Sequence, residues 1–225
     1  MKALIIYGGW DGHEPGPVSQ IFRKALQAKG VEVEMSDKLD PLADAEKMKA
    51  FDVFTPIWTM GTMSGEQWNG LNAAVKAGLG IAGVHGGMGD AFRANLDYQW
   101  MVGGQFVGHP HVGDYEVKIV DSKNPITEGM KSPFPYKSEQ YYQIIDPGVH
   151  TLATTLYKHD GHEITMPCSW TKTWGKGRVF YSALGHCAKE FTDYPAVLDM
   201  TIRGILWAAA GKAGTAKCGC GCCKK

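Results

Sequence analysis

The sequence predicts an α/β protein with a doubly wound, mostly parallel sheet and extra strands in its second half. Apolar runs such as residues 2–7 lack the alternation of a strand with one solvent face, which is typical of buried parallel strands. Segments with helical spacing separate these runs, and this β-α alternation is that of a parallel sheet. Residues 115–120 alternate instead, which favours an added strand with a solvent face.

The first half contains four expected strands with helices between them. Residues 2–7 end in the glycine-rich loop 8–13, and residues 18–29 repeat apolar side chains at helical spacing. Ser64 and Gln67 have the spacing of a capping box, which marks a further helix. The expected order is strand 2–7, helix 18–29, strand 31–35, short helix 45–51, strand 52–58, the helix after Ser64, and strand 81–84.

The second half is expected to add strands joined by loops. The expected strands are 115–120, 139–144, 150–157, 167–171 and 179–182, with a hairpin turn at 174–178 and loop material at 103–111, 124–127 and 133–135. A final helix, 196–210, is expected to end at Gly211. No linker interrupts this order, so we expect one domain over residues 1–211 and a flexible, cysteine-rich tail over residues 212–225.

Composition and charge narrow the classes of function. Of 225 residues, 44% are hydrophobic and 20% charged, which is ordinary for a globular protein with a sizeable core. Lys plus Arg and Asp plus Glu both number 23, so the net charge of zero argues against nucleic acid or a membrane surface as partner. The first apolar run is too short for a signal peptide, and none reaches the roughly 18 residues of a membrane span. We therefore expect a cytoplasmic protein.

A glycine-flanked turn at His85 is the most informative motif. Residues 80–87 read Gly-Ile-Ala-Gly-Val-His-Gly-Gly, an apolar strand that enters a sharp turn. Hydrolases and amidotransferases expose a reactive serine or cysteine at such a turn, where glycine accepts backbone angles that other residues avoid. An imidazole suits proton transfer or metal binding near neutral pH better than a stable acyl intermediate. The motif argues against acyl transfer and for metal or acid–base chemistry.

Three further histidines follow expected strands or border glycines: His13, His109 and His186. A metal site needs three or four converging imidazole or carboxylate ligands, and no local motif such as His-Glu-x-x-His is present. We expect His85, His109 and His186 to hold a divalent metal (zinc, manganese or iron) and His13 to bind substrate. A hydrogen-bonded or surface histidine is the competing interpretation for each.

Glu139 is the expected catalytic carboxylate beside His85, because it begins an aromatic strand after a proline-rich loop. A plain surface carboxylate is the alternative. Trp10 and Trp58 offer flat faces for a sugar, although core packing is the commoner use of tryptophan. The expected substrate-binding residues are Trp10, His13, Trp58, Gly86, Gly87 and Tyr141.

Ordered motifs run from residue 1 to about Gly211. They read Gly-Val-His-Gly-Gly at 83–87, Gly-Gly-Gln-Phe at 103–106 with His109-Pro110, Asn-Pro-Ile-Thr-Glu-Gly at 124–129, Glu-Gln-Tyr-Tyr at 139–142, Met-Pro-Cys-Ser-Trp-Thr at 166–171, Gly-Lys-Gly-Arg-Val-Phe-Tyr at 175–181 and Leu-Gly-His at 184–186. Together they resemble the trehalose-utilisation (ThuA-like) family. The resemblance implies a flavodoxin-like, class I glutamine-amidotransferase-like fold with the catalytic cysteine replaced by His85, and a role in sugar catabolism. Asn124 departs from the family, where histidine often precedes this proline.

The six cysteines divide into two groups. Cys168 and Cys187 lie in the body and are expected to be free thiols in a reducing compartment. The other four crowd into the tail, and they are Cys218, Cys220, Cys222 and Cys223. Four thiolates suit a soft metal such as zinc or copper(I), and a disordered appendage with reactive thiols is the alternative.

Two functions from different classes stay open. The first is a sugar-catabolism enzyme acting on a sugar or keto-sugar derivative by His/Glu acid–base chemistry, with metal assistance and no nucleotide cofactor, of isomerase, lyase or hydrolase type. The second is a sugar- or effector-binding module that kept the fold and lost the nucleophile. A working glutamine amidotransferase is not expected, because Cys168 and Cys187 lie away from the turn. A homo-oligomer is compatible with either function.

Overall fold

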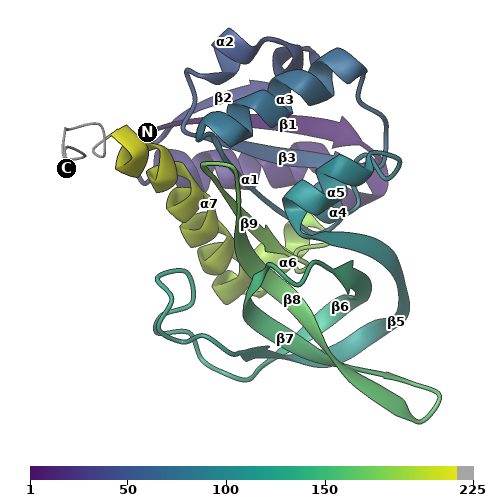
Figure 1. Cartoon of the computed structure of the whole chain (residues 1–225). Helices are drawn as coiled ribbons and strands as arrows, with labels where there is room; N and C mark the ends of the chain where they lie inside the picture. The colour runs from purple at the N-terminus through teal and green to yellow at the C-terminus, as the bar shows by residue number, and fades with distance from the viewer. Residues whose placement is uncertain (217–225) are drawn as a thin grey trace, which may run out of the picture.

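The computed structural model describes residues 1–216, and its centre is one nine-stranded sheet. The strand order is β2-β1-β3-β4-β9-β8-β7-β5-β6 (Figure 1). Strand β9 (Gly177–Ser182) joins two different halves, since it pairs parallel with β4 (Gly80–Val84) and antiparallel with β8 (His162–Trp174). The expected mixed α/β protein with a large sheet and extra strands in its second half is confirmed. The finer flavodoxin-like winding stays a prediction.

The parallel half agrees closely with the sequence. Strand β1 (Lys2–Gly9) lies between β2 (Glu32–Ser36) and β3 (Val53–Thr59), and β3 pairs with β4. Residues 3–6 are fully buried, which explains their unbroken apolar run. Each of the four expected strands lies within two residues of the observed one at both ends.

Helices surround the parallel half (Figure 1). They are η1 (Asp11–His13), α1 (Pro15–Gln27), η2 (Asp40–Ala43), α2 (Ala45–Met48), α3 (Gly65–Ala77), α4 (His85–Gly89), α5 (Leu96–Val102), α6 (Ala188–Asp193) and α7 (Pro195–Ala216). Helices α1, α6 and α7 contact one another, and α3 packs on α2 and η2. The predicted capping box is present, with Ser64 Oγ accepting from Gln67 N–H and the Gln67 amide oxygen accepting from Ser64 N–H. None of the helices within residues 1–216 is long and apolar enough to cross a membrane.

The predicted helix end at Gly211 is wrong, because α7 continues to Ala216. Glycine is tolerated inside a helix at a cost of about 1 kcal/mol. Here the Arg178 side chain occupies the space beside Gly211, where a Cβ would lie 2.8 Å from its Cδ. The division at residue 211 therefore stays a prediction, and residues 217–225 of the expected tail, with all four of its cysteines, lie outside the described residues.

The antiparallel half differs most from expectation. It consists of β5 (Gly104–Ile119), β6 (Phe134–Ile145), β7 (His150–His159) and β8. The predicted loops at 103–111 and 133–135 are wrong, because most of these residues belong to β5 and β6. In β5 the pairing register shifts on both sides of Gly108, so this glycine lies at a bulge rather than in a loop. In β6, Pro135 is accommodated because β6 is the last strand of the sheet.

Candidate functional site

The turn at His85 has the strained geometry that the glycines predict. Strand β4 ends at Val84, and α4 starts at His85 with a φ of 43°, in the left-handed region that side chains disfavour. A Cβ on Gly86 would overlap the ring of His13, and one on Gly87 would lie 3.1 Å from the Cα of Ile57. The glycines thus let the turn approach two neighbouring segments while it presents the His85 imidazole.

Hydrogen bonds fix the orientation of the His85 ring. Its Nδ1 donates to the carbonyl oxygen of Ala183 at 2.8 Å, since that oxygen can only accept. Its Nε2 points to Glu139 Oε2 at 3.1 Å. The His85 side chain is 2% exposed. This pattern, with one ring nitrogen tied to a carbonyl, is typical of histidines that bind a metal through the other nitrogen.

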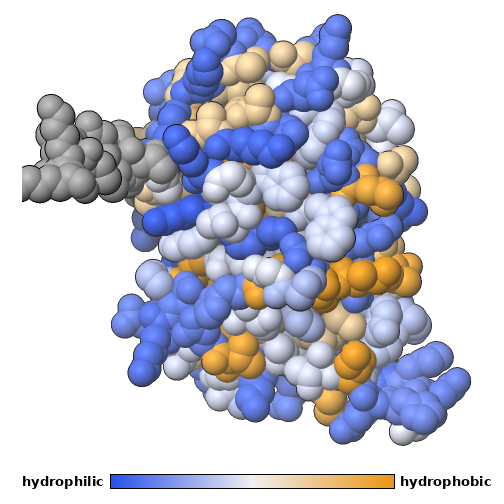
Figure 2. Space-filling model, viewed as in Figure 1, coloured by the Kyte–Doolittle hydropathy of each residue, from blue (hydrophilic) through white to orange (hydrophobic). Residues whose placement is uncertain are grey.

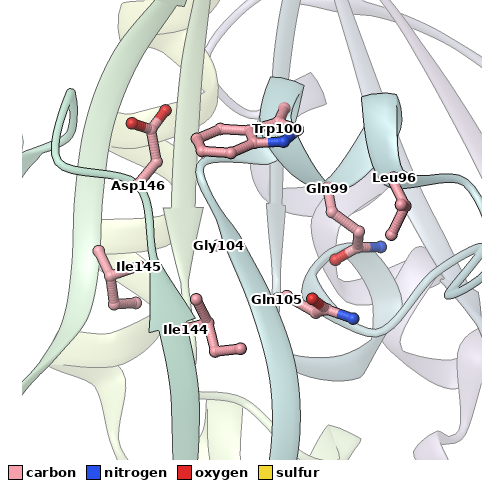
Figure 3. Close-up of a pocket in the computed structure, with 8 residues that line it drawn as sticks. All are labelled: Leu96, Gln99, Trp100, Gly104, Gln105, Ile144, Ile145 and Asp146. Carbon is pink, nitrogen blue, oxygen red and sulfur yellow. The ribbon is translucent and has the colours of Figure 1, made fainter.

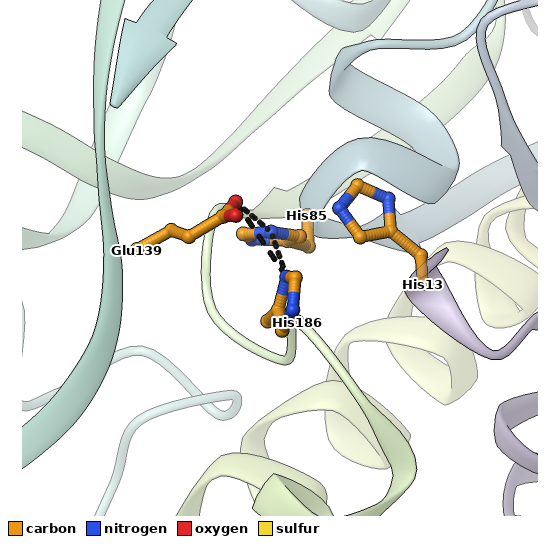
Figure 4. Close-up of side chains that lie close together, drawn as sticks. All are labelled: His13, His85, Glu139 and His186. Atoms are coloured by element: carbon orange, nitrogen blue, oxygen red, sulfur yellow. Dashed lines mark hydrogen bonds and ion pairs between the residues drawn. The ribbon is translucent and has the colours of Figure 1, made fainter. Parts of the chain in front are cut away.

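Four side chains from different elements converge here: His13, His85, Glu139 and His186 (Figure 4). Their ligand atoms all lie within 4.8 Å of one another, and we call this group the histidine cluster. His13 ends η1 after β1, Glu139 comes from β6, and His186 follows β9. The loops after parallel strands β1, β4 and β9 therefore meet at one edge of the sheet, as expected for an α/β fold.

The spacing within the histidine cluster suits a metal ion. His85 Nε2, His186 Nδ1 and Glu139 Oε2 are separated by 3.1, 3.3 and 3.5 Å. Ligands at about 2.0–2.1 Å from a tetrahedral zinc lie about 3.3–3.4 Å apart. Three atoms that each carry a lone pair repel one another at this spacing. A proton or a metal cation between them removes this repulsion. The residues present therefore fit a divalent metal.

Contacts within the cluster shift the pKa values of three of its members. Burial raises the pKa of the Glu139 carboxyl, but hydrogen bonds from His186 and His85 outweigh it and hold this pKa below its usual range. The hydrogen bond with Glu139 raises the pKa of His186. Burial, and then the nearby His85 and His186, lower the pKa of His13 to about 3. At neutral pH, Glu139 is ionised and His13 is neutral, and these are the forms that bind metals. The raised pKa of His186 favours its protonated form instead, so a metal must displace that proton.

His13 is also held in place by a hydrogen bond outside the cluster. Its Nδ1 lies 2.7 Å from Thr59 Oγ1 at the end of β3, and its ring is 8% exposed. Because Nδ1 is engaged by the hydroxyl, Nε2 is the nitrogen left for a ligand. The sequence assigned His13 to substrate, whereas the geometry brings it into the histidine cluster.

A buried network behind the cluster positions His186, and no local pattern in the sequence indicates it. Glu190 Oε2 accepts from the backbone N–H of His186 at 2.8 Å and from the hydroxyl of Tyr136. The same hydroxyl accepts from Gly185 N–H at 2.9 Å. Glu190 and Tyr136 are 8% and 1% exposed. The network links β6 to α6 and fixes the loop that carries His186.

The other predicted site residues lie around the cluster or apart from it. His109 is 41% exposed in its side chain and places Nε2 at 3.6 Å from Glu139 Oε1, outside the group of four. The Tyr141 ring lies 4.1 Å from the His85 ring between centroids, and the exposed Trp10 meets His13 edge-on at 4.8 Å. Trp58 packs against Gly8 near the end of β1 and against Gly61 after β3.

The two described cysteines do not provide a nucleophile at the turn. Cys168 is buried in β8, and burial raises the pKa of its thiol to about 12. Cys187 is the N-cap residue of α6, and neither thiol is hydrogen-bonded to His85 in the part of the chain that the structure describes.

Comparisons with known proteins concern the family and the fold of the chain. The ThuA family model, described as trehalose utilisation, matches residues 2–208. A ThuA-like protein from Bacteroides uniformis superposes with a TM-score of 0.77 at 17% identity, over 92% of this chain and 91% of that one. A second from Parabacteroides merdae gives 0.73 at 18% identity, over 94% and 91%. The glutaminase domain of Trypanosoma brucei CTPS gives 0.52 at 12% identity, over 94% of both chains, which shows a shared fold. No curated protein matches the sequence.

Proposed function

The chain belongs to the trehalose-utilisation (ThuA) family, and from this premise we propose that it is an enzyme of sugar catabolism. The proposed substrate is a sugar or keto-sugar derivative, and the proposed chemistry is proton transfer beside a divalent metal. The observation that carries the proposal is the convergence of three imidazoles and a carboxylate at the His85 turn. Isomerases, lyases and hydrolases acting next to a keto group share this chemistry.

The ligands proposed for the metal are His13, His85, His186 and Glu139. Imidazole and carboxylate donors suit zinc, manganese or iron. When bound, such an ion stabilises negative charge that develops on a substrate oxygen. Hydrogen bonds from outside the cluster position these ligands. Ala183 binds the His85 ring, and Thr59 binds the His13 ring. Glu190 binds the backbone N–H of His186.

Glu139 and His109 are proposed to move the substrate proton. Glu139 Oε2 faces His85 and His186, whereas Oε1 faces His109 at 3.6 Å. A hydrogen on the carbon next to a keto group is acidic, so Glu139 accepts it at Oε1. His109, with its exposed ring, exchanges the proton with water. His109, which the sequence predicts to be a metal ligand, is thus proposed to transfer protons instead.

The substrate is proposed to enter beside Trp10 and Tyr141. Trp10 is 47% exposed and stands next to His13, so the free face of its indole is available to a sugar ring. The Tyr141 hydroxyl borders Gly86, where a Cβ would lie 3.1 Å from it. Burial raises the pKa of Tyr141 well above its usual value, so the hydroxyl remains a donor. We propose a cytoplasmic protein whose partner is a small sugar, without nucleotide cofactor, nucleic acid or membrane.

The test is turnover of a panel of keto sugars by the wild type, with and without a chelator. We expect a chelator-sensitive activity that His85→Ala abolishes. His159→Ala is the matched control, because His159 is exposed at the end of β7 and should leave activity unchanged. Sugar binding that survives chelation, with no turnover in the panel, would contradict the enzyme and favour the binding module instead.

A further inference from the structure

We propose that a pocket apart from the histidine cluster binds a neutral sugar ring. The pocket has a volume of about 260 Å³ and lies between α5, the start of β5 and the end of β6 (Figure 3). Ligand pockets for drug-sized molecules span about 300–1,000 Å³, so this one suits a ligand the size of one pyranose. The choice of a sugar as ligand rests on the proposed function.

An exposed aromatic side chain forms one wall of the pocket. Trp100 is 54% exposed, and Leu96 and Ile144 beside it are 62% and 63% exposed. Figure 2 shows apolar side chains on this face of the molecule, below α5. Large apolar side chains grouped in this way mark a binding surface. The Trp100 backbone is anchored, since its carbonyl oxygen accepts from Lys172 Nζ at 2.6 Å.

Two amides supply the polar side of the pocket. Gln99 is 5% exposed, and its Nε2 donates to Ala91 O at 2.8 Å while its Oε1 has no partner. A buried acceptor of this kind is costly unless a donor reaches it. Figure 3 shows the amide of Gln105 next to that of Gln99, and Gln105 makes no side-chain hydrogen bond within residues 1–216. A ligand hydroxyl that donates to Oε1 would remove this cost.

Asp146 makes the pocket suitable for a neutral ligand. Its Oδ1 accepts from Gly148 N–H at 2.8 Å, and its Oδ2 is paired with Lys172. The carboxylate is therefore neutralised and held in one orientation, where it still accepts from a ligand hydroxyl. None of the residues that line the pocket is basic, which disfavours an anionic ligand. A flat apolar face with hydroxyls around its edge, as in a pyranose, matches both walls.

This pocket is separate from the histidine cluster. Ile144 follows Glu139 by five residues in the same strand, which corresponds to about 17 Å at about 3.3 Å per residue. A single sugar cannot occupy both places. The pocket is therefore a site that holds a sugar without transforming it.

The experiment is a titration of the full-length protein with glucose, and separately with trehalose, followed by the indole N–H signals of its tryptophans in NMR spectra. Trp100→Phe assigns the Trp100 signal. We expect this signal to shift and saturate, and Trp100→Ala to weaken binding at the pocket about fivefold or more, because the aromatic contact is lost. Gln105→Leu should weaken it as well at similar side-chain volume. Val120→Ala is the control, because this exposed residue belongs neither to the pocket nor to the histidine cluster.

Three results would overturn the inference. One is a Trp100 signal that glucose and trehalose leave unmoved, and another is unchanged binding in both pocket variants. The third is a dimer, detected by sedimentation, that dissociates in Trp100→Ala. The surface around Trp100 would then be an interface between two copies of the chain. Each is independent of the proposed function, which fails only when keto-sugar turnover is absent or insensitive to His85→Ala.

Discussion

Replacing Tyr136 with phenylalanine tests whether the histidine cluster depends on the network behind it. The Tyr136 hydroxyl donates to Glu190 and accepts from Gly185 N–H, and the side chain is 1% exposed. Its removal deletes a hydrogen bond to a charged group, worth about 1.5–3 kcal/mol, and leaves a buried N–H without a partner, at about 1–3 kcal/mol. Together these two contributions predict that the free energy of unfolding falls by about 2.5–6 kcal/mol. We also expect the Kd for zinc to rise by about 10–100-fold, as for other groups that support metal ligands.

Urea unfolding measures the stability change, and a competition titration with zinc measures the affinity. Tyr157→Phe is the matched control, because Tyr157 is also buried but its hydroxyl has no partner. Its loss should leave zinc affinity unchanged and change stability little. A Tyr136→Phe protein that is destabilised yet binds zinc as tightly as the wild type would refute the positioning of His186 by Tyr136.

Two further predictions concern the turn and the pH dependence of stability. Gly86→Ala should lower metal affinity at least about tenfold, because the new methyl group overlaps the His13 ring. The same zinc titration measures this affinity. A variant that binds zinc as tightly as the wild type would contradict the close approach of Gly86 to His13. Burial raises the pKa of Asp146, but hydrogen bonds from Lys172 and Gly148 outweigh it and hold the pKa below its ordinary value of 3.8. The resulting stabilisation is present above pH 3.8 and is lost as the pH falls through the folded-state pKa. The wild type should therefore unfold at a higher temperature than Asp146→Asn near neutral pH, and the difference should shrink in acid; a constant difference would contradict the pairing.

The parallel half was predictable because its signals are local. A buried parallel strand is apolar on both faces. Residues 2–7 and 81–84 can therefore be recognised as strands from their own sequence, without knowledge of the strands that pair with them. The same holds for the turn at His85, where flanking glycines mark a strained backbone.

The cluster itself was only partly predictable, because its remaining members depend on long-range pairing. Gly108 was interpreted as part of a loop, whereas it lies at a bulge of β5 that carries His109 to the rim of the cluster. His13 became a ligand candidate through the close approach of its loop to Gly86. The contact between Tyr136 and Glu190 spans 54 residues and follows no local pattern.

The most direct test of the account is the metal content of the purified full-length protein, measured by elemental analysis. We predict about one zinc, manganese or iron per chain, retained when Cys218, Cys220, Cys222 and Cys223 are all changed to serine and lost in His85→Ala. A protein without metal, or one whose metal disappears with the four cysteines and persists in His85→Ala, would contradict a metal site at the histidine cluster.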